Sequence, residues 1–311
     1  MARVFVTRRL PGHALERLAA DHETDVWPER LPPPRSELLA RTAEVDGLLC
    51  MLADGVDAEL IEHAPRLRAI SNYAVGTDNV DLTAASGRAI AVGHTPDVLT
   101  DATADLAFAL LLAVARALPE AAAAVRAGDW PTWEPARFLG RSVHGATLGI
   151  VGLGRIGRAV AQRARGFEME VLATPTATSG GAPLETVLER SDFVSLHCPL
   201  TPATRHLIDA PALTRMRPTA ILVNTARGAI VDPVALRRAL EDGAIAGAAL
   251  DVTDPEPMAP DDPLLAAPNL LVTPHIGSAT TAARERMGEL AVENLLAGLA
   301  GRPMPHQVNA T

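Results

Sequence analysis

The chain has 311 residues, of which 48% are hydrophobic, 21% charged and 3% aromatic, and its formal net charge is -9. This length exceeds what a single hydrophobic core usually organises, so two domains are expected. No long basic run is present, which argues against a nucleic-acid or membrane partner because such surfaces need clustered Lys or Arg.

The two cysteines, Cys50 and Cys198, both lie in apolar, strand-like runs. A disulfide framework needs more cysteines, and a zinc site needs ligand pairs that are absent here, so we expect reduced thiols and no metal. The N-terminus reads as a strand and not as a signal segment. The longest apolar stretch, 104–118, contains Asp105 and Arg116 and is too short to cross a bilayer. A cytoplasmic protein is expected.

The first hundred residues alternate short apolar runs with helix-like segments, which is the pattern of βαβ units around a parallel sheet. Helices are predicted over 11–20, 35–42 and 58–63. Strands are predicted over 4–7, 25–27, 47–51, 68–72 and 90–93.

An Ala/Leu-rich stretch over 101–127 is predicted to form a helix that leaves the first domain, an interruption at Pro119, and a second helix. An extended loop is expected over 128–145, where Trp130 and Trp133 lie among Pro and Gly residues. A second alternating region and a final helix over 280–299 follow, and the six strands of this region suggest a doubly wound nucleotide-binding sheet. These strands are predicted over 148–152, 169–173, 193–198, 220–225, 248–252 and 270–273.

Gly152, Gly154 and Gly157 form a G-x-G-x-x-G motif between a predicted strand and a predicted helix. In this context Gly152 suits a tight turn, Gly154 lets the backbone approach a pyrophosphate, and Gly157 allows close packing of helix on strand. The N-terminus of the helix then faces the anion. The motif therefore indicates a dinucleotide site.

The strand over 169–173 should end on the acidic residue that binds the ribose of NAD, but no carboxylate stands there. The chain continues as Thr174-Pro-Thr-Ala-Thr-Ser179, which is rich in hydroxyl groups and has no Arg or Lys. A missing carboxylate removes repulsion against a 2′-phosphate, and Thr174 and Thr176 could hydrogen-bond that phosphate. The missing Arg removes its usual partner. NADP(H) is favoured over NAD(H), and the choice stays open.

Arg227, Glu256 and His275 each follow a predicted strand of the second region. The carboxyl ends of parallel strands meet at one edge of a sheet, so the three side chains are expected to converge. Arg227 offers a planar fork for a substrate carboxylate, His275 can donate a proton to a substrate oxygen, and Glu256 can hold the other imidazole nitrogen. Reduction of a 2-keto acid needs this set. His197 is expected near the cofactor, whereas His94 and the remaining six histidines are assigned surface or structural roles.

Together these motifs resemble the D-2-hydroxyacid dehydrogenase family, and most closely its glyoxylate/hydroxypyruvate reductase branch. The resemblance covers nearly the whole chain. Its motifs lie at 72–79, 100–105, 152–157, 198–201, 224–228, 251–257 and 273–278.

The resemblance implies an α/β protein with two doubly wound parallel-sheet domains. A Rossmann NAD(P)-binding domain over 100–280 is inserted in a flavodoxin-like substrate (catalytic) domain over 1–99 and 281–311. It also implies hydride transfer from NAD(P)H to a small 2-keto acid, with glyoxylate giving glycolate and hydroxypyruvate giving D-glycerate. Members of the family are usually homodimers, and in this branch an aromatic residue of the loop over 130–138, here Trp133, reaches the partner's active site.

Individual residues carry over from the same resemblance. Arg227, Glu256 and His275 match the catalytic Arg, Glu and His. The substrate-binding residues are Leu52, Val75, Gly76, Arg227, Ser278 and Trp133. The candidate cofactor-binding residues, which include the glycine motif and the two threonines after the strand over 169–173, are Thr103, Gly152, Gly154, Arg155, Ile156, Gly157, Thr174, Thr176, Cys198, Pro199, Thr204, Thr225, Ala226, Asp251, His275 and Gly277.

Three alternatives stay open. The substrate could be another small acid, such as pyruvate. Phosphite oxidation ranks lower, because Val75 stands where phosphite dehydrogenase has a Lys in its substrate loop. A dinucleotide-sensing binding protein ranks lowest, because such a role usually accompanies a long disordered extension, and the composition shows none.

Overall fold

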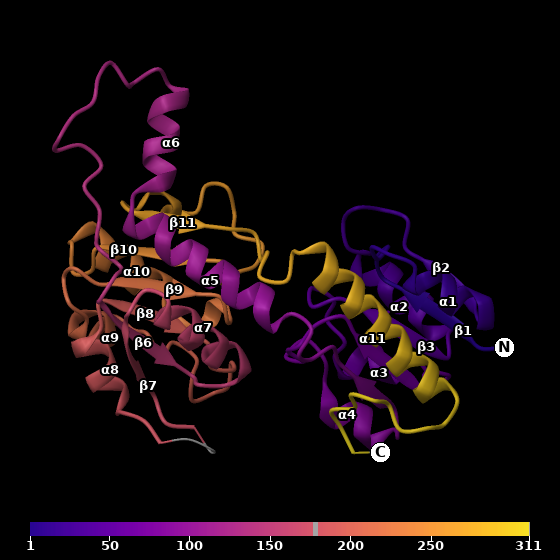
Figure 1. Cartoon of the computed structure of the whole chain (residues 1–311). Coiled ribbons are helices and arrows are strands. Elements are labelled where there is room, and N and C mark those ends of the chain that lie inside the picture. Colours follow the sequence, from indigo (N-terminus) through magenta and orange to yellow (C-terminus); the bar gives the residue numbers. More distant parts are fainter. Residues whose placement is uncertain (177–179, 311) are drawn as a thin grey trace. The chain divides into compact units, whose positions relative to one another are not determined.

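The structure is a computed structural model that describes residues 1–176 and 180–310. The chain divides into two compact units (Figure 1). Unit 1 consists of Met1–Leu99 and Ala279–Thr311, and unit 2 consists of Thr100–Ser278. Unit 1 is therefore discontinuous, because the chain returns to it after completing unit 2.

Unit 1 is built on a parallel sheet with the strand order β2-β1-β3-β4-β5. The order reverses between β1 and β3, as in flavodoxin-like doubly wound folds. The strands are β1 (Arg3–Val6), β2 (Glu23–Val26), β3 (Gly47–Cys50), β4 (Ala69–Asn72) and β5 (Ala91–Gly93). The helices are α1 (Ala14–Asp21), α2 (Arg35–Ala43), α3 (Ala58–His63), α4 (Leu82–Gly87) and α11 (Thr281–Leu299).

Local sequence explains these elements. Every residue of β3 and β4 is buried, as expected for central parallel strands that are covered on both faces. Three of the helices begin at a side chain that accepts a hydrogen bond from the first turn, which satisfies otherwise unpaired N–H groups. These N-caps are Asp57 for α3, Asp81 for α4 and Thr280 for α11.

The segment after α11 lies along the edge strand β5. The N–H of Val308 donates to the carbonyl of Val92 at 2.9 Å, and the N–H of Val92 donates to Oδ1 of Asn309 at 2.8 Å. This contact satisfies backbone groups that an edge strand otherwise leaves exposed. The polar composition of the segment gave no sign of it.

Unit 2 is built on a parallel sheet with the strand order β11-β10-β9-β8-β6-β7, which reverses between β6 and β8. The strands are β6 (Thr147–Val151), β7 (Glu170–Ala173), β8 (Phe193–Leu196), β9 (Ile221–Asn224), β10 (Gly247–Leu250) and β11 (Leu270–Val272). The helices are α5 (Thr100–Ala115), α6 (Leu118–Arg126), α7 (Arg155–Arg165), α8 (Leu184–Arg190), α9 (Ala210–Arg215) and α10 (Pro233–Glu241), with short 3-10 turns at Gly228–Ile230 and Pro263–Ala266.

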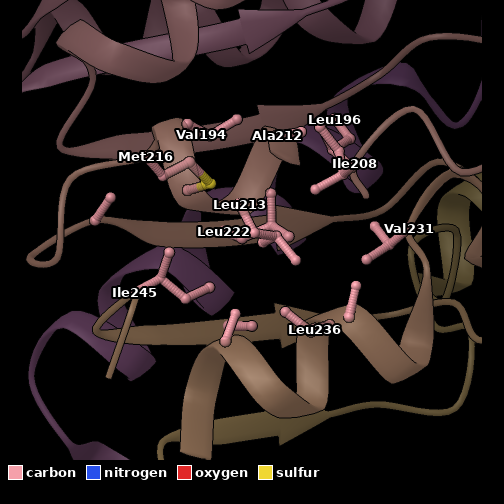
Figure 2. Close-up of a cluster of buried hydrophobic side chains, with 14 of the residues drawn as sticks. Val194, Leu196, Ile208, Ala212, Leu213, Met216, Leu222, Val231, Leu236 and Ile245 are labelled. Atoms are coloured by element: carbon pink, nitrogen blue, oxygen red, sulfur yellow. The ribbon is translucent and has the colours of Figure 1, made fainter. Parts of the chain in front are cut away.

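The sheet of unit 2 separates two hydrophobic clusters. Successive residues of a strand point to opposite faces, so Leu222 joins one cluster whereas Ile221 and Val223 join the other. Figure 2 shows the first cluster, in which Leu222 of β9 lies with Leu213 of α9 and Leu236 of α10.

The predicted two-sheet α/β architecture is confirmed, and each predicted strand is present with its ends within two residues. The predicted interruption at Pro119 is wrong in position. The break falls between Ala115 and Leu118, where Ala117 adopts a left-handed conformation, and Pro119 lies in the first turn of α6. Proline is tolerated in a first turn because its missing N–H has no helical partner there.

Residues 118–139, which we call the arm, project from the rest of unit 2 (Figure 1). No residue of α6 is buried. Among the described residues no single helix is long and apolar enough to span a membrane, and the α5–α6 pair passes that test only jointly, across a bend of 65°. The arm exposes large apolar side chains, namely Leu118, Val125, Trp130, Trp133, Phe138 and Leu139.

Asn294 of α11 joins two chain segments of unit 1, the residue after β5 and the C-terminal segment, by hydrogen bonds. Replacing it should destabilise the protein. Its side chain is fully buried, donates to the carbonyl of His94 at 2.8 Å and accepts from the N–H of His306 at 3.0 Å. We predict that Asn294→Ala lowers the free energy of unfolding by about 1–3 kcal/mol, because two partly buried backbone groups lose their hydrogen-bond partners. Urea unfolding followed by circular dichroism measures this.

The control is Glu289→Ala, on the same helix, which removes only an exposed ion pair with Arg286. It should cost at most about 1 kcal/mol. Equal losses in the two variants would contradict the prediction.

Candidate active site

The glycine motif brings the ends of two strands together. Gly152 follows β6 with φ +97°, and a Cβ added to it would lie 2.5 Å from the backbone nitrogen of Cys198, which follows β8. Both its conformation and its surroundings therefore exclude a side chain. The strand order of unit 2 reverses between β6 and β8, which is where ligands of doubly wound sheets bind.

The other two glycines have different surroundings. A Cβ on Gly157 would lie 2.3 Å from the carbonyl oxygen of Gly152, so this glycine permits close packing of α7 on the turn. A Cβ on Gly154, the N-cap of α7, would have no atom within 4 Å. The space in front of α7 is open, and the N–H groups of its first turn, which includes Arg155 and Ile156, face it. This arrangement fits a pyrophosphate.

Two threonines flank the motif. Thr225, directly after β9, has a buried hydroxyl that has no hydrogen-bond partner among residues 1–176 and 180–310, so a bound ligand could satisfy it. The Thr174 hydroxyl oxygen accepts from the N–H of Gly152 at 3.0 Å, which leaves its proton for a further acceptor. Thr176 is half-buried, whereas Ala177, Thr178 and Ser179 lie outside the described residues.

The remaining cofactor candidates lie in loops at the same edge. Thr204 donates its hydroxyl to the carbonyl of Pro199 at 2.7 Å and so closes the turn after β8. In that turn, burial raises the pKa of the Cys198 thiol, which therefore stays protonated near neutral pH. Nε2 of His197 lies 2.8 Å from Oγ of Ser195, and burial lowers the pKa of His197 to about 4, so this imidazole is neutral at pH 7.

His275 and Glu256 form a direct pair. Nδ1 of His275 lies 2.5 Å from Oε1 of Glu256, and the side chains are 24% and 33% exposed, respectively. A carboxylate accepts hydrogen bonds, so Nδ1 carries the hydrogen and Nε2 is left to face a ligand. His275 adopts φ +53°, which is uncommon for a residue other than glycine.

Asp251, at the end of β10, holds the His275 loop in place. Its Oδ1 accepts from the hydroxyl of Thr273 at 2.6 Å and from the N–H of Ile276 at 2.8 Å. Its Oδ2 accepts from the N–H of Gly277 at 2.7 Å, and its carbonyl accepts from the N–H of His275 at 2.8 Å. Thr103 adds a bond of 3.2 Å from its hydroxyl to the carbonyl of Gly277. No local sequence pattern indicates this set of hydrogen bonds around Asp251.

Arg227 stands in the loop after β9, two strands from the end of β11 that carries His275. Asn224 shapes this loop, because its side chain donates to the carbonyl of Arg227 at 2.9 Å and accepts from the N–H of Ala226 at 3.0 Å. The structure thus pairs Glu256 with His275 directly and places Arg227 at the same carboxyl edge of the sheet.

In unit 1 the loop over 74–77 presents unpaired backbone N–H groups. The carbonyls of Ala74, Val75 and Gly76 each accept one hydrogen bond, whereas the N–H groups of Val75 and Gly76 donate to no group among residues 1–176 and 180–310. Two free neighbouring amides of this kind suit an anion. The three donors are the N–H of Thr95 at 2.9 Å, Nδ1 of His94 at 2.8 Å and Nδ2 of Asn72 at 2.9 Å.

The other predicted substrate residues lie in separate places. Leu52 follows β3 in a loop held by buried Asp54, which accepts from the N–H of Met51 at 2.7 Å. Ser278 is the last residue of unit 2. Trp133 lies on the arm with its side chain 79% exposed, and not among the loops at the carboxyl edge of the sheet.

Comparison with known proteins agrees with this geometry. Residues 108–277 match the D-isomer specific 2-hydroxyacid dehydrogenase, NAD binding domain. A glyoxylate reductase from Korarchaeum cryptofilum is 48% identical over 317 residues, covering 99% of this chain and 96% of the relative.

Solved structures are similar as well. A protein from Thermus thermophilus is 52% identical with a TM-score of 0.93 and covers 98% of this chain and 99% of its own. An NADPH-dependent glyoxylate/hydroxypyruvate reductase from Sinorhizobium meliloti, in complex with NADP and malonate, is 34% identical with a TM-score of 0.86, covering 98% and 96%. The resemblance inferred from the motifs is confirmed: the chain belongs to the D-isomer specific 2-hydroxyacid dehydrogenase family, an oxidoreductase family that uses a nicotinamide dinucleotide.

Proposed function

We propose that this protein is a glyoxylate/hydroxypyruvate reductase, which reduces the keto group of a small 2-keto acid to give glycolate or D-glycerate. The observation that carries the proposal is the 2.5 Å contact between His275 and Glu256, set beside the glycine turn at the carboxyl edge of one sheet. The glyoxylate reductase that is 48% identical over 99% of the chain supports the choice of substrate.

The proposed chemistry assigns one task to each residue. The guanidinium of Arg227 binds the substrate carboxylate and polarises the keto oxygen. His275 donates the proton on Nε2 to that oxygen, while Glu256 fixes the orientation and tautomer of the imidazole through Nδ1. The free amides of Val75 and Gly76 bind carboxylate oxygens, and Leu52 and Ser278 line the substrate pocket.

The same proposal places the cofactor on the glycine motif. Gly152, Gly154 and Gly157 hold the pyrophosphate against the first turn of α7, with Arg155 and Ile156. When bound, the reduced nicotinamide supplies the hydride. The other residues proposed to surround the cofactor are Thr103, Thr174, Thr176, Cys198, Pro199, Thr204, Thr225, Ala226, Asp251, His275 and Gly277.

We further propose that NADP(H) is preferred to NAD(H). Thr174, the residue directly after β7, offers a hydroxyl, and no carboxylate stands there to repel a 2′-phosphate. Thr174 retains a hydroxyl proton for that phosphate, because only its oxygen is used by Gly152.

We also propose a homodimer joined through the arms. The arm exposes six large apolar side chains and α6 buries none of its residues, which is unusual for a helix in a monomer. A second copy of the chain covers such a patch in the simplest closed assembly. In this dimer Trp133 reaches the active site of the partner.

Replacing the proposed acid or the proposed carboxylate-binding cation should strongly reduce turnover. His275→Asn keeps a residue that tolerates φ +53°, and we predict a fall in kcat of about 10²–10⁴-fold with glyoxylate and NADPH. For Arg227→Ala we predict a fall in kcat/KM of about 10²–10³-fold. NADPH absorbance is measured with glyoxylate, hydroxypyruvate and pyruvate.

Arg215→Ala, which removes only an exposed ion pair with Glu189, serves as the control and should behave as wild type. Full activity of His275→Asn would contradict the mechanism. Turnover of pyruvate alone would move the substrate to another small acid, and no turnover would leave phosphite oxidation and then dinucleotide sensing.

A carboxylate at the end of β7 should reverse the cofactor preference. In Thr174→Asp the new side chain can still accept from the N–H of Gly152, but it repels a 2′-phosphate and binds ribose hydroxyls. We predict that the ratio of kcat/KM for NADPH to that for NADH falls at least about tenfold, the size of one charged contact. Thr174→Ser is the matched control and should keep the wild-type ratio. A wild-type enzyme that prefers NADH would overturn the proposed preference.

Charges on the arm should dissociate the dimer. We predict that the wild type sediments as a dimer and that a Trp130→Glu/Leu139→Glu variant sediments as a monomer, because the charges are costly to bury. Leu31→Glu, at an equally exposed leucine outside the arm, should remain dimeric. Trp133→Ala should raise KM for the keto acid without changing the sedimentation of the dimer. A monomeric wild type would rule out the arm as the interface.

A further inference from the structure

We propose that His94 is a positioning residue that aims the backbone N–H of Gly76 at the substrate carboxylate. The inference rests on the proposed reductase function for the identity of the anion. It gives a specific task to a histidine whose sequence context suggested only a surface or structural role. His94 acts through the loop over 74–77 and has no direct part in hydride or proton transfer.

The geometry depends on a single peptide plane. Nδ1 of His94 donates to the carbonyl oxygen of Val75 at 2.8 Å. A carbonyl oxygen only accepts, so Nδ1 carries the hydrogen whenever this bond is present. The C=O of Val75 and the N–H of Gly76 belong to the same planar trans peptide and point in opposite directions. Holding the oxygen therefore fixes the direction of the Gly76 N–H.

The neighbouring peptides have other clamps, so the task of His94 is specific. The N–H of Thr95 holds the carbonyl of Ala74 and thereby fixes the N–H of Val75, and Asn72 holds the carbonyl of Gly76. Only the peptide between Val75 and Gly76 depends on the imidazole. Both peptides that adjoin Gly76 are free to rotate because glycine has the widest backbone freedom, and of the two it is the one between Val75 and Gly76 that His94 holds.

The backbone of His94 is itself held firmly. Its carbonyl accepts from Nδ2 of buried Asn294 at 2.8 Å, and its N–H donates to the carbonyl of His306 at 3.1 Å. The preceding Gly93 packs closely on Asn294, since a Cβ there would lie 2.8 Å from the Asn294 side chain. The backbone that carries the imidazole is thus held in place, and the hydrogen bond from Nδ1 to Val75 restrains the loop over 74–77 against it.

The experiment compares three variants of His94 with a matched control. His94→Ala removes the donor, and His94→Gln moves an amide donor one bond farther out. His94→Asn places an amide nitrogen at the same number of bonds from Cα as Nδ1 and so restores the donor. The control is His306→Ala, because His306 joins this cluster through main-chain atoms. Each protein is assayed for KM with glyoxylate and with NADPH, and for oxalate binding by calorimetry.

We expect His94→Ala and His94→Gln to raise KM for glyoxylate about tenfold, which corresponds to about 1.4 kcal/mol. The dissociation constant for oxalate should rise in parallel, while KM for NADPH stays within about twofold. His94→Asn should recover most of the loss, and the control should match the wild type. A merely structural role for His94 would instead lower thermal stability and raise both KM values together.

Several outcomes overturn the proposal. One is an unchanged KM for glyoxylate and oxalate affinity in His94→Ala, or in His94→Gln if the alanine variant does not fold. Another is failure of His94→Asn to recover. A third is a wild type that neither binds oxalate nor reduces a keto acid. A wild type that binds oxalate but reduces no keto acid would refute the proposed function alone, and the order of oxalate affinities among the variants would still decide the role of His94.

Discussion

The loop of unit 2 that carries His275 depends on the buried carboxylate of Asp251. A buried negative charge is costly unless donors surround it, and here the donors are the hydroxyl of Thr273 and the N–H groups of Ile276 and Gly277. These residues lie on both sides of His275, so the bonds that satisfy the charge also fix the loop that carries the imidazole. This support explains how His275 can hold φ +53°, a conformation that persists only where its surroundings enforce it. Because the loop is already fixed, little further conformational entropy is lost when the His275 side chain contacts Glu256.

In unit 1 hydrogen bonds also fix a loop, but here donors hold its backbone carbonyls, whereas in unit 2 a carboxylate accepts from backbone N–H groups. There the carbonyls of the loop over 74–77 accept hydrogen bonds, whereas the N–H groups of Val75 and Gly76 donate to no group among residues 1–176 and 180–310. Because each amide plane carries its C=O and N–H in opposite directions, satisfying one group aims the other. In both units these devices lie in loops at the carboxyl ends of parallel strands, which bring chain segments far apart in sequence to one edge. Preorganised backbone of this kind binds an anion without having to rearrange when the ligand arrives.

The features that the sequence predicted are those with a local signal. Runs such as 47–50 and 220–223 are continuously apolar, which predicts buried parallel strands, and the glycine motif has a fixed spacing. Arg227, Glu256 and His275 could be proposed because each follows such a strand. The clamp of Asp251 and the bond of His94 to Val75 could not, because they depend on side-chain direction and on folding of the loops. The pairing of Val92 with Asn309 joins residues 217 positions apart, and no local pattern encodes it.

The end of β7 shows how two requirements meet in one side chain. Thr174 is the residue to which we assign the choice between dinucleotides, and its oxygen also accepts from the N–H of Gly152 in the turn. A residue at this position must therefore be an acceptor, as Thr, Ser and Asp are. Arg or Lys has no acceptor atom and would leave that half-buried N–H unpaired, at a cost of about 1–3 kcal/mol. A basic residue is thus disfavoured at 174 because it would leave the N–H of Gly152 without an acceptor, whichever dinucleotide the protein binds.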